Sequence, residues 1–223
     1  MTVKLFIEAI LKFTLGVVLI GALIFWPAGT LAFTGGWLLM GILFIPMFIA
    51  GFVMMAKDPS LLASRLEAKE KEKTQSIVVK LSGLMFIVGF VLAGLDFRFG
   101  WVKLPFIVNI VASVVFIVAY IIYAEVLREN TYLSRTIKVV EGQKVISTGL
   151  YGIVRHPMYF ATVLLFMAMP LVLGSIVSFV VFLAYPFIIA ARIKNEEEVL
   201  SRELDGYDEY KKTVKYRMIP FIW

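Results

Sequence analysis

The sequence contains no cysteine, and among its 223 residues histidine occurs once, as His156. Without a thiol the chain can hold no disulfide, no zinc–thiolate site and no cysteine nucleophile, which excludes several classes of enzyme. Charged residues are also scarce, at 17% of the chain, against about 25% in soluble domains. Hydrophobic residues make up 61%, where about 45–50% is usual. This composition predicts an integral membrane protein.

Long uncharged runs divide the chain into membrane helices, so the expected fold is all-α. Residues 13–56 carry no charged side chain, and one helix of that length would be about twice the ~30 Å thickness of the hydrocarbon layer. The run must therefore turn, and Pro27–Thr30 followed by Gly35–Gly36 supplies the break. The same reasoning along the chain predicts about six transmembrane helices, at Val3–Trp26, Gly36–Ala56, Ser76–Leu95, Leu104–Leu127, Pro157–Leu173 and Ser175–Ile193.

The last two of these helices come from one uncharged run, Pro157–Ala191. The run is too long for one pass and short for two, so we expect a tight C-terminal helical hairpin that turns at Leu173–Ser175. Kinks are expected near Pro170 and Pro186. A cytoplasmic amphipathic helix should follow the hairpin.

Two polar loops interrupt the apolar runs. The first, residues 57–75, should hold a short helix on the membrane surface with three leucines on one side, namely Leu61, Leu62 and Leu66. The second, residues 128–155, leads into the hairpin. We therefore divide the chain into a four-helix transmembrane region, residues 1–127, and a catalytic region, residues 128–223.

The positive charges predict an orientation. Of the 22 Lys and Arg residues, Lys12 and Lys80 fall within helices, and Arg98 and Lys103 lie in loops on one side, which leaves 18 on the other side. By the positive-inside rule, that side is cytoplasmic and holds both termini and His156. The net charge of +6 thus reflects membrane orientation, and neither nucleic-acid binding nor an obligate protein partner is expected. Membrane lipids are the expected surroundings.

The segment Ser147–Phe160 stands where a polar loop meets the apolar hairpin. Pro157 suits the first turn of a helix, because its fixed φ fits there and its missing N–H would be unpaired anyway. Arg155 and His156 then precede a helix N-terminus, whose free N–H groups and dipole favour an anionic group.

A second polar cluster follows the hairpin. Arg192 and Glu196, four residues apart, share one helical face. Because a tight hairpin brings its two ends together, His156 and Tyr159 should meet this pair. The alternative is that these are ordinary interfacial charges, but three consecutive carboxylates beside an apolar hairpin are costly unless a cation or water serves them.

These motifs together resemble a known family. Gly149-Leu-Tyr-Gly-Ile-Val-Arg-His-Pro-Met-Tyr159, the hairpin, Arg192-Ile-Lys-Asn-Glu-Glu-Glu198 and Tyr207-Asp-Glu-Tyr210 are similar to segments of the isoprenylcysteine carboxyl methyltransferase family. The resemblance runs from about Glu129 to the C-terminus. It implies a polytopic helical membrane enzyme that uses S-adenosylmethionine.

The resemblance also implies roles for individual residues. Arg192 and Glu196 would be catalytic, with Arg192 facing the substrate. Charge adds Arg155, for the carboxylate of the cofactor, and Glu197 beside Glu196, for its ammonium and sulfonium groups. The full set of predicted cofactor-binding residues is Gln143, Lys144, Val145, Ile146, Tyr151, Arg155, His156, Pro157, Met158, Tyr159, Glu196 and Glu197.

The methyl acceptor is predicted only as a class. It is a lipophilic or small molecule with a carboxylate, thiol or amine, and a carboxylate or thiolate would need no general base. An amphipathic acceptor could reach a site at the membrane surface laterally from the bilayer.

A different class of enzyme carries a similar pattern. The spacing Gly-x-x-Gly-x-x-Arg-His-Pro-x-Tyr and the tail from Lys211 to Trp223 also resemble membrane sterol reductases, which bind NADPH. This chain is shorter than those reductases, and Asn195–Glu198 follows the methyltransferase pattern more closely. A membrane scaffold without enzymatic activity is a third reading, which motifs paired across a hairpin do not favour.

Overall fold

The computed structural model describes residues 3–66, 73–133 and 139–223, so the middle of each polar loop lies outside the described residues. Throughout the described chain the regular elements are helices, and no strand is present. The helices are α1 (Val3–Ala28), α2 (Thr34–Lys57), α3 (Pro59–Leu66), α4 (Lys73–Phe99), α5 (Phe106–Glu129), η1 (Gly149–Gly152), α6 (Pro157–Val172), α7 (Ile176–Phe182), α8 (Tyr185–Glu203) and α9 (Tyr207–Thr213). The all-α prediction is confirmed.

The chain is a multi-pass integral membrane protein. Five helical segments are long and apolar enough to span a bilayer: α1, α2, α4 from Gln75, α5, and the α7–α8 pair taken together. The remaining predicted span is α6, whose 16 residues reach about 24 Å, less than the ~30 Å of hydrocarbon. The expected six passes are therefore five long helices and one short one.

The hairpin turns where the sequence predicts. Gly174 takes the left-handed conformation with φ of 76°, and the side chain of Ser175 caps α7 by accepting a hydrogen bond from the N–H of Ser178. Asp96 at the end of α4 accepts hydrogen bonds from the Ser175 hydroxyl at 2.6 Å and from the N–H of Val102 at 3.0 Å. The break between α7 and α8 falls just before Pro186, because proline removes a helical N–H donor.

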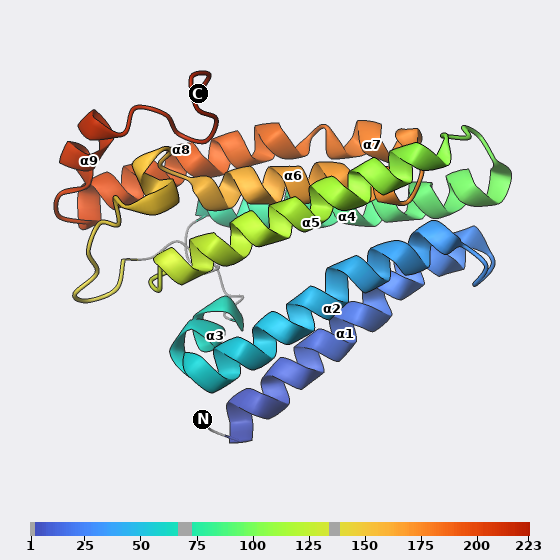
Figure 1. Ribbon diagram of the computed structural model, residues 1–223, viewed down its shortest axis with the longest axis horizontal. Coiled ribbons are helices and arrows are strands. Elements are labelled where there is room, and N and C mark those ends of the chain that lie inside the picture. Colours follow the sequence, from blue (N-terminus) through green and yellow to red (C-terminus); the bar gives the residue numbers. More distant parts are fainter. Residues whose placement is uncertain (1–2, 67–72, 134–138) are drawn as a thin grey trace.

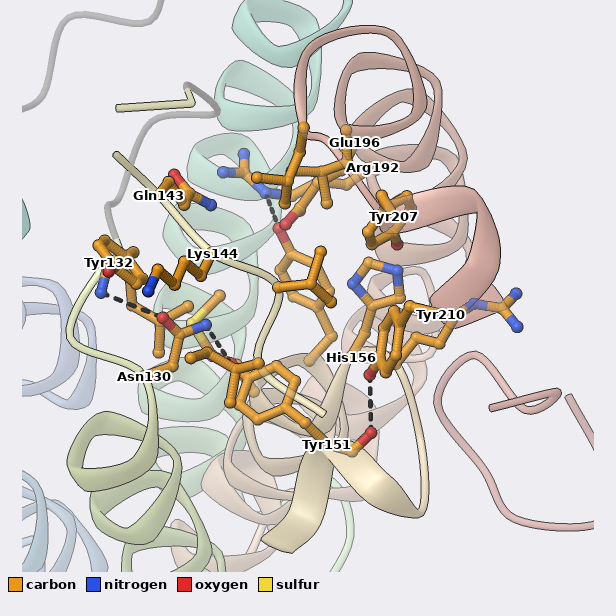
Figure 2. Close-up of a pocket in the computed structure, with 18 residues that line it drawn as sticks. Asn130, Tyr132, Gln143, Lys144, Tyr151, His156, Arg192, Glu196, Tyr207 and Tyr210 are labelled. Carbon is orange, nitrogen blue, oxygen red and sulfur yellow. Dashed lines mark hydrogen bonds between the residues drawn. The ribbon is translucent and has the colours of Figure 1, made fainter. Parts of the chain in front are cut away.

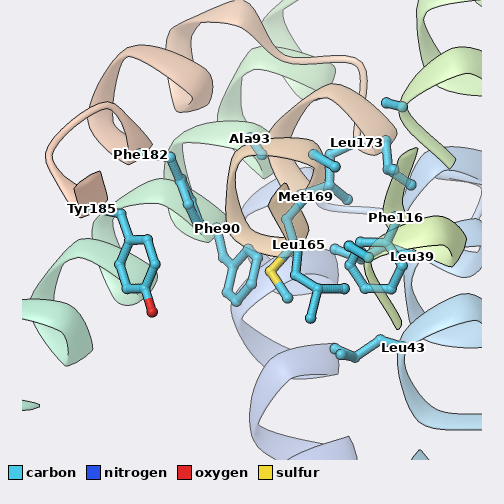
Figure 3. Close-up of a cluster of buried hydrophobic side chains, with 14 of the residues drawn as sticks. Leu39, Leu43, Phe90, Ala93, Phe116, Leu165, Met169, Leu173, Phe182 and Tyr185 are labelled. Carbon is cyan, nitrogen blue, oxygen red and sulfur yellow. The ribbon is translucent and has the colours of Figure 1, made fainter. Parts of the chain in front are cut away.

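The core runs along the middle of the bundle. α5 packs along α6, α1 packs on α4, and α4 contacts both α7 and α8. Figure 3 shows the aromatic centre of this core, where Phe90 from α4, Phe116 from α5 and Phe182 from α7 are fully buried. In contrast, long apolar side chains of α1 and α2 such as Leu15 and Phe52 are exposed, as expected of helices that face lipid.

The helices leave one end of the bundle more polar and more elaborate than the other. Figure 1 shows the N-terminus, α3 and α9 at one end, with the turn between α6 and α7 at the opposite end. The last turn of α5, the start of α6 and the C-terminal part of α8 meet at the end that carries α9. The two motifs singled out in the sequence are therefore brought together there.

Candidate functional site

A cavity of about 90 Å³ lies at this end, between the segments that precede α6 and the helices α8 and α9. Figure 2 shows the side chains that line it. Among the residues predicted to form the site, those that line the cavity are Gln143, Lys144, Val145, Ile146, Tyr151, Arg155, His156, Met158, Tyr159, Arg192 and Glu196. Pro157 and Glu197 are not among its lining residues. Sequence reasoning gave no site role to the lining residues Asn130, Tyr132, Leu133, Leu200, Leu204, Tyr207 and Tyr210, although Tyr207 and Tyr210 belong to a motif that carries the resemblance.

Tyr159 joins the two helices of the hairpin on the cavity wall. Its hydroxyl donates a short hydrogen bond to Oε2 of Glu196 and accepts one from Nε of Arg192 at 2.8 Å. The Arg192 guanidinium also lies 5.9 Å from the centre of the tyrosine ring. The expectation that Tyr159 meets Arg192 and Glu196 is therefore confirmed, whereas His156, expected to meet the same pair, contacts Glu197 instead.

Glu197 faces away from the cavity into a buried ionic cluster. Its Oε1 lies 2.7 Å from Nε of Arg155 and 3.3 Å from Nε2 of His156, and its Oε2 lies 2.8 Å from Nε of Arg217. Successive residues on a helix point about 100° apart; here Glu196 lines the cavity, Glu197 does not, and Glu198 is exposed. Glu197 thus balances the charge of the protein's own cations.

The C-terminal tail holds the segment before α6. The N–H of Arg155 donates to the carbonyl of Tyr216 at 2.9 Å, and the N–H of His156 donates to that of Arg217 at 2.7 Å. The Arg155 guanidinium donates further to the carbonyls of Val214 and Lys215. The predicted anion site at this helix start is thus partly occupied by the protein itself, because these donors already have partners.

Tyr151 and Tyr210 form a second wall. The Tyr210 hydroxyl donates to the Tyr151 carbonyl at 2.7 Å (Figure 2), and Asn130 donates through Nδ2 to the Tyr151 hydroxyl at 3.1 Å. Burial raises the pKa of both phenols, so both stay protonated at neutral pH.

Glu129 at the end of α5 anchors the start of η1. Its carboxylate accepts a hydrogen bond from the N–H of Leu150, with Oε2 at 3.0 Å. Gly149 has a φ of 52°, and a Cβ there would lie 1.4 Å from Oε1 of Glu129. Two independent reasons therefore favour glycine at position 149: the backbone is left-handed, and the Glu129 carboxylate leaves no room for a Cβ.

The Tyr207 hydroxyl is buried in the cavity wall without a partner. The residue is 4% exposed, and its oxygen is one of two buried polar side-chain atoms that make no hydrogen bond within the described chain, the other being Oε1 of Gln75. Figure 2 shows Tyr207 next to His156. A buried polar group without a partner costs about 1–3 kcal/mol, so the site is suited to a ligand that bonds to this hydroxyl.

Comparison with known proteins identifies related sequences for this part of the chain. Residues 109–202 match the model of the Isoprenylcysteine carboxyl methyltransferase (ICMT) family. The chain is also similar to the Delta(14)-sterol reductase TM7SF2 of Mus musculus, at 28% identity over 91 residues. That match covers 40% of this chain and 22% of the mouse protein, so the chain spans about a fifth of its relative. The resemblance, inferred from about Glu129 to the C-terminus, is thus confirmed up to residue 202, and the match begins earlier, at residue 109. The motif Tyr207–Tyr210 lies outside the matched residues.

Proposed function

Because residues 109–202 form a domain of the isoprenylcysteine carboxyl methyltransferase family, we propose that this protein is a membrane-embedded methyltransferase. It moves a methyl group from S-adenosylmethionine to a lipophilic or small acceptor that carries a carboxylate, thiol or amine. The observation that carries the proposal is the cluster of Tyr159, Arg192 and Glu196 on the wall of one cavity. This cluster places an anionic and a cationic side chain together at the end of the apolar hairpin where α6 begins.

The side chains around the cavity suit this cofactor. Bound there, S-adenosylmethionine supplies a methyl group on a positively charged sulfur. Glu196 would bind its positive charge, Lys144 would face its carboxylate, and the unpartnered Tyr207 hydroxyl would gain a hydrogen bond. The rings of Tyr151 and Tyr210 offer flat apolar surface for the nucleoside. The cavity of about 90 Å³ is below the roughly 300–1,000 Å³ of typical ligand pockets, so its side chains must move apart on binding.

The protein's contribution to the reaction is to hold the reactants and to exclude water. Arg192 would hold the acceptor, and its own position is fixed by the hydrogen bond to Tyr159. The nucleophile of the acceptor forms its bond to the methyl carbon with its own electron pair, while the pair of the broken carbon–sulfur bond stays on sulfur. A carboxylate or thiolate acceptor therefore needs no base from the chain.

The proposed location is the cytoplasmic surface of the membrane. α1 begins, and α3 lies, at the same end of the bundle as the start of α6 and α9 (Figure 1). The sequence assigns 18 of the 22 basic residues to this side, which by the positive-inside rule would be cytoplasmic. An amphipathic acceptor would reach it laterally, because α5, which ends beside the site, exposes large apolar side chains such as Ile110 and Ile121.

A second candidate is an NADPH-dependent oxidoreductase. It is favoured by the similarity of this region to a mouse protein named as a sterol reductase. Against it, Glu196 on the cavity wall would repel the phosphates of a dinucleotide.

The proposal is tested by methyl transfer in a lipid bilayer. Purified protein in nanodiscs is incubated with methyl-labelled S-adenosylmethionine and a lipid and metabolite extract, and labelled products are identified by mass spectrometry. Wild type should label at least one product, and Arg192→Gln should not. Arg202→Gln is the matched control, because Arg202 lies on the same helix but its side chain is 64% exposed. The absence of any labelled product with wild type would contradict the proposal.

A further inference from the structure

The short helix α3 lies against the site although it precedes the matched domain. Asp58 caps it by accepting hydrogen bonds from the Ser60 hydroxyl and from the N–H of Leu61. On the other side the Ser64 hydroxyl lies 3.1 Å from the carbonyl of Leu133, a residue that lines the cavity. The position of α3 is thus fixed relative to the cavity wall.

Arg65, at the last turn of α3, reaches across to α5 and α6. Its NH1 lies 3.9 Å from the sulfur of Met158, and its NH2 donates to the hydroxyl of Tyr123. The guanidinium also lies 5.6 Å from the centre of the Tyr123 ring. Met158 also lines the cavity. Arg65 is therefore linked to the cavity through the side chain of Met158.

These partners are weak ones for an arginine. A thioether sulfur is a weak acceptor and a phenol oxygen is a neutral one, whereas a guanidinium offers five donors that match a carboxylate or a phosphate. Within the described chain, Arg65 pairs with no carboxylate. Among the described residues this half-buried cation thus has no counter-charge, and such a cation costs free energy unless an anion is supplied.

The surroundings of Arg65 indicate which anion this is. α3 is a short helix whose Leu61 and Leu62 are buried, and it lies at the end of α2 where the apolar span stops. In the apolar spans that lead to this end, Phe52 on α2 and Ile121 on α5 expose large apolar side chains. At this level of a bilayer the abundant oxyanion is the phosphate of a phospholipid, with acyl chains directly adjacent.

We propose that Arg65 binds the phosphate of a phospholipid from the surrounding leaflet, at a lipid site formed by α3, the end of α5 and the start of α6. The phosphate replaces the Met158 sulfur as a hydrogen-bond acceptor, and the acyl chains lie on the exposed apolar side chains of α2 and α5. Because Met158 also walls the cavity, this lipid changes the contacts of a residue that lines the methyl-transfer site. The inference does not rest on the proposed function. Arg65 and α3 lie outside residues 109–202, whereas their partners Tyr123 and Met158 lie within them.

The test compares two lipids with the same chains. Delipidated protein in detergent is titrated with dioleoylphosphatidylglycerol and with dioleoylglycerol, which lacks the phosphate, and bound lipid is counted by native mass spectrometry. Wild type should bind the phospholipid about tenfold more tightly or better. Arg65→Gln should bind both lipids equally, and Arg65→Lys should keep part of the preference, since it retains the charge but loses the planar fork. Lys57→Gln, which removes an exposed cation at the same end, should change the affinity less than twofold.

Further variants separate a lipid site from a structural role. Tyr123→Phe removes a neutral partner of Arg65, so it should leave the phospholipid affinity unchanged or raise it. Equal losses in Arg65→Gln and Lys57→Gln, or a loss in Tyr123→Phe as large as in Arg65→Gln, would overturn the proposal. Competition by millimolar glycerol phosphate as effective as that by the whole lipid would identify a site for free phosphate and would likewise overturn it.

Discussion

Arg155 and Glu197 form a buried ion pair, with Nε and Oε1 2.7 Å apart and both side chains 8% exposed. The pair joins the segment before α6 to α8. Together with the bond of His156 to the same carboxylate, it fixes the two halves of the cavity relative to each other. The site therefore depends on a carboxylate, Glu197, that does not itself line the cavity.

Removal of this carboxylate should destabilise the protein strongly. Glu197→Gln leaves Arg155 without its counter-charge in a buried position, which costs about 3–5 kcal/mol. Glu203→Gln is the control, because it breaks an exposed pair with Arg202 worth at most about 1 kcal/mol. Thermal unfolding in detergent should show a much larger decrease in Tm for Glu197→Gln. Equal decreases would show that the buried cluster does not hold the site together.

Two tyrosines on the cavity wall should respond in opposite ways. Tyr207→Phe removes a buried hydroxyl that has no partner in the described chain, so the ligand-free protein should gain stability, by up to about 1–3 kcal/mol. Its affinity for S-adenosylhomocysteine should fall. Tyr210→Phe removes a bond to the Tyr151 carbonyl and should lose about 0.5–1.5 kcal/mol of stability. A loss of stability in Tyr207→Phe without any change in affinity would argue that its hydroxyl serves the fold.

The contact between Gly149 and Glu129 gives a third prediction. Gly149→Ala and Gly142→Ala both place a side chain on left-handed backbone, but only at Gly149 would the new Cβ meet a neighbour, the Glu129 carboxylate. Both variants should lose ~1–2 kcal/mol of stability, because alanine is strained on left-handed backbone. Only Gly149→Ala should also displace Glu129 and lower cofactor affinity. The two variants are compared by thermal unfolding and by calorimetry. Equal losses of stability and equal cofactor affinities in the two variants would show that the contact with Glu129 does not shape the site.

The orientation is a prediction that the absence of cysteine makes simple to test. Single cysteines replacing Lys212 and Trp101, both exposed, should be labelled by an impermeant maleimide from opposite sides of a sealed membrane. Lys212 should react from the cytoplasmic side. Labelling of both positions from one side would refute the proposed arrangement of passes.

The fold was largely predictable because lipid imposes a simple rule on sequence. Uncharged runs of sufficient length predict helices, and the hairpin turn follows from Leu173–Ser175. The shortness of α6 was predicted as well, since the expected helix Pro157–Leu173 differs from α6 by one residue. The end of α8 was not, because the helix continues past Ile193 through charged residues to Glu203. The division at residues 127 and 128 stays a prediction.

The site was predictable only where local geometry decides it. A tight hairpin with Arg192 and Glu196 one turn apart must bring these residues to the start of α6, and they meet Tyr159 there. The pairing of the tail with Arg155 and His156 joins segments about 60 residues apart, and no local pattern encodes it. Glu197 follows Glu196 by about 100° of helical turn, which could have indicated that the two carboxylates have different partners.

The central claim, that this cavity binds S-adenosylmethionine through Glu196, is tested most directly by calorimetric titration of wild type and Glu196→Gln with S-adenosylhomocysteine, S-adenosylmethionine and NADPH. Wild type should bind both sulfur compounds, and Glu196→Gln should weaken S-adenosylmethionine binding by ~1.5–3 kcal/mol, because a charge-assisted contact is lost. Glu198→Gln, which changes an exposed neighbour, should leave the affinity unchanged. Tight binding of NADPH that improves in Glu196→Gln, with no heat from either sulfur compound, would contradict the account.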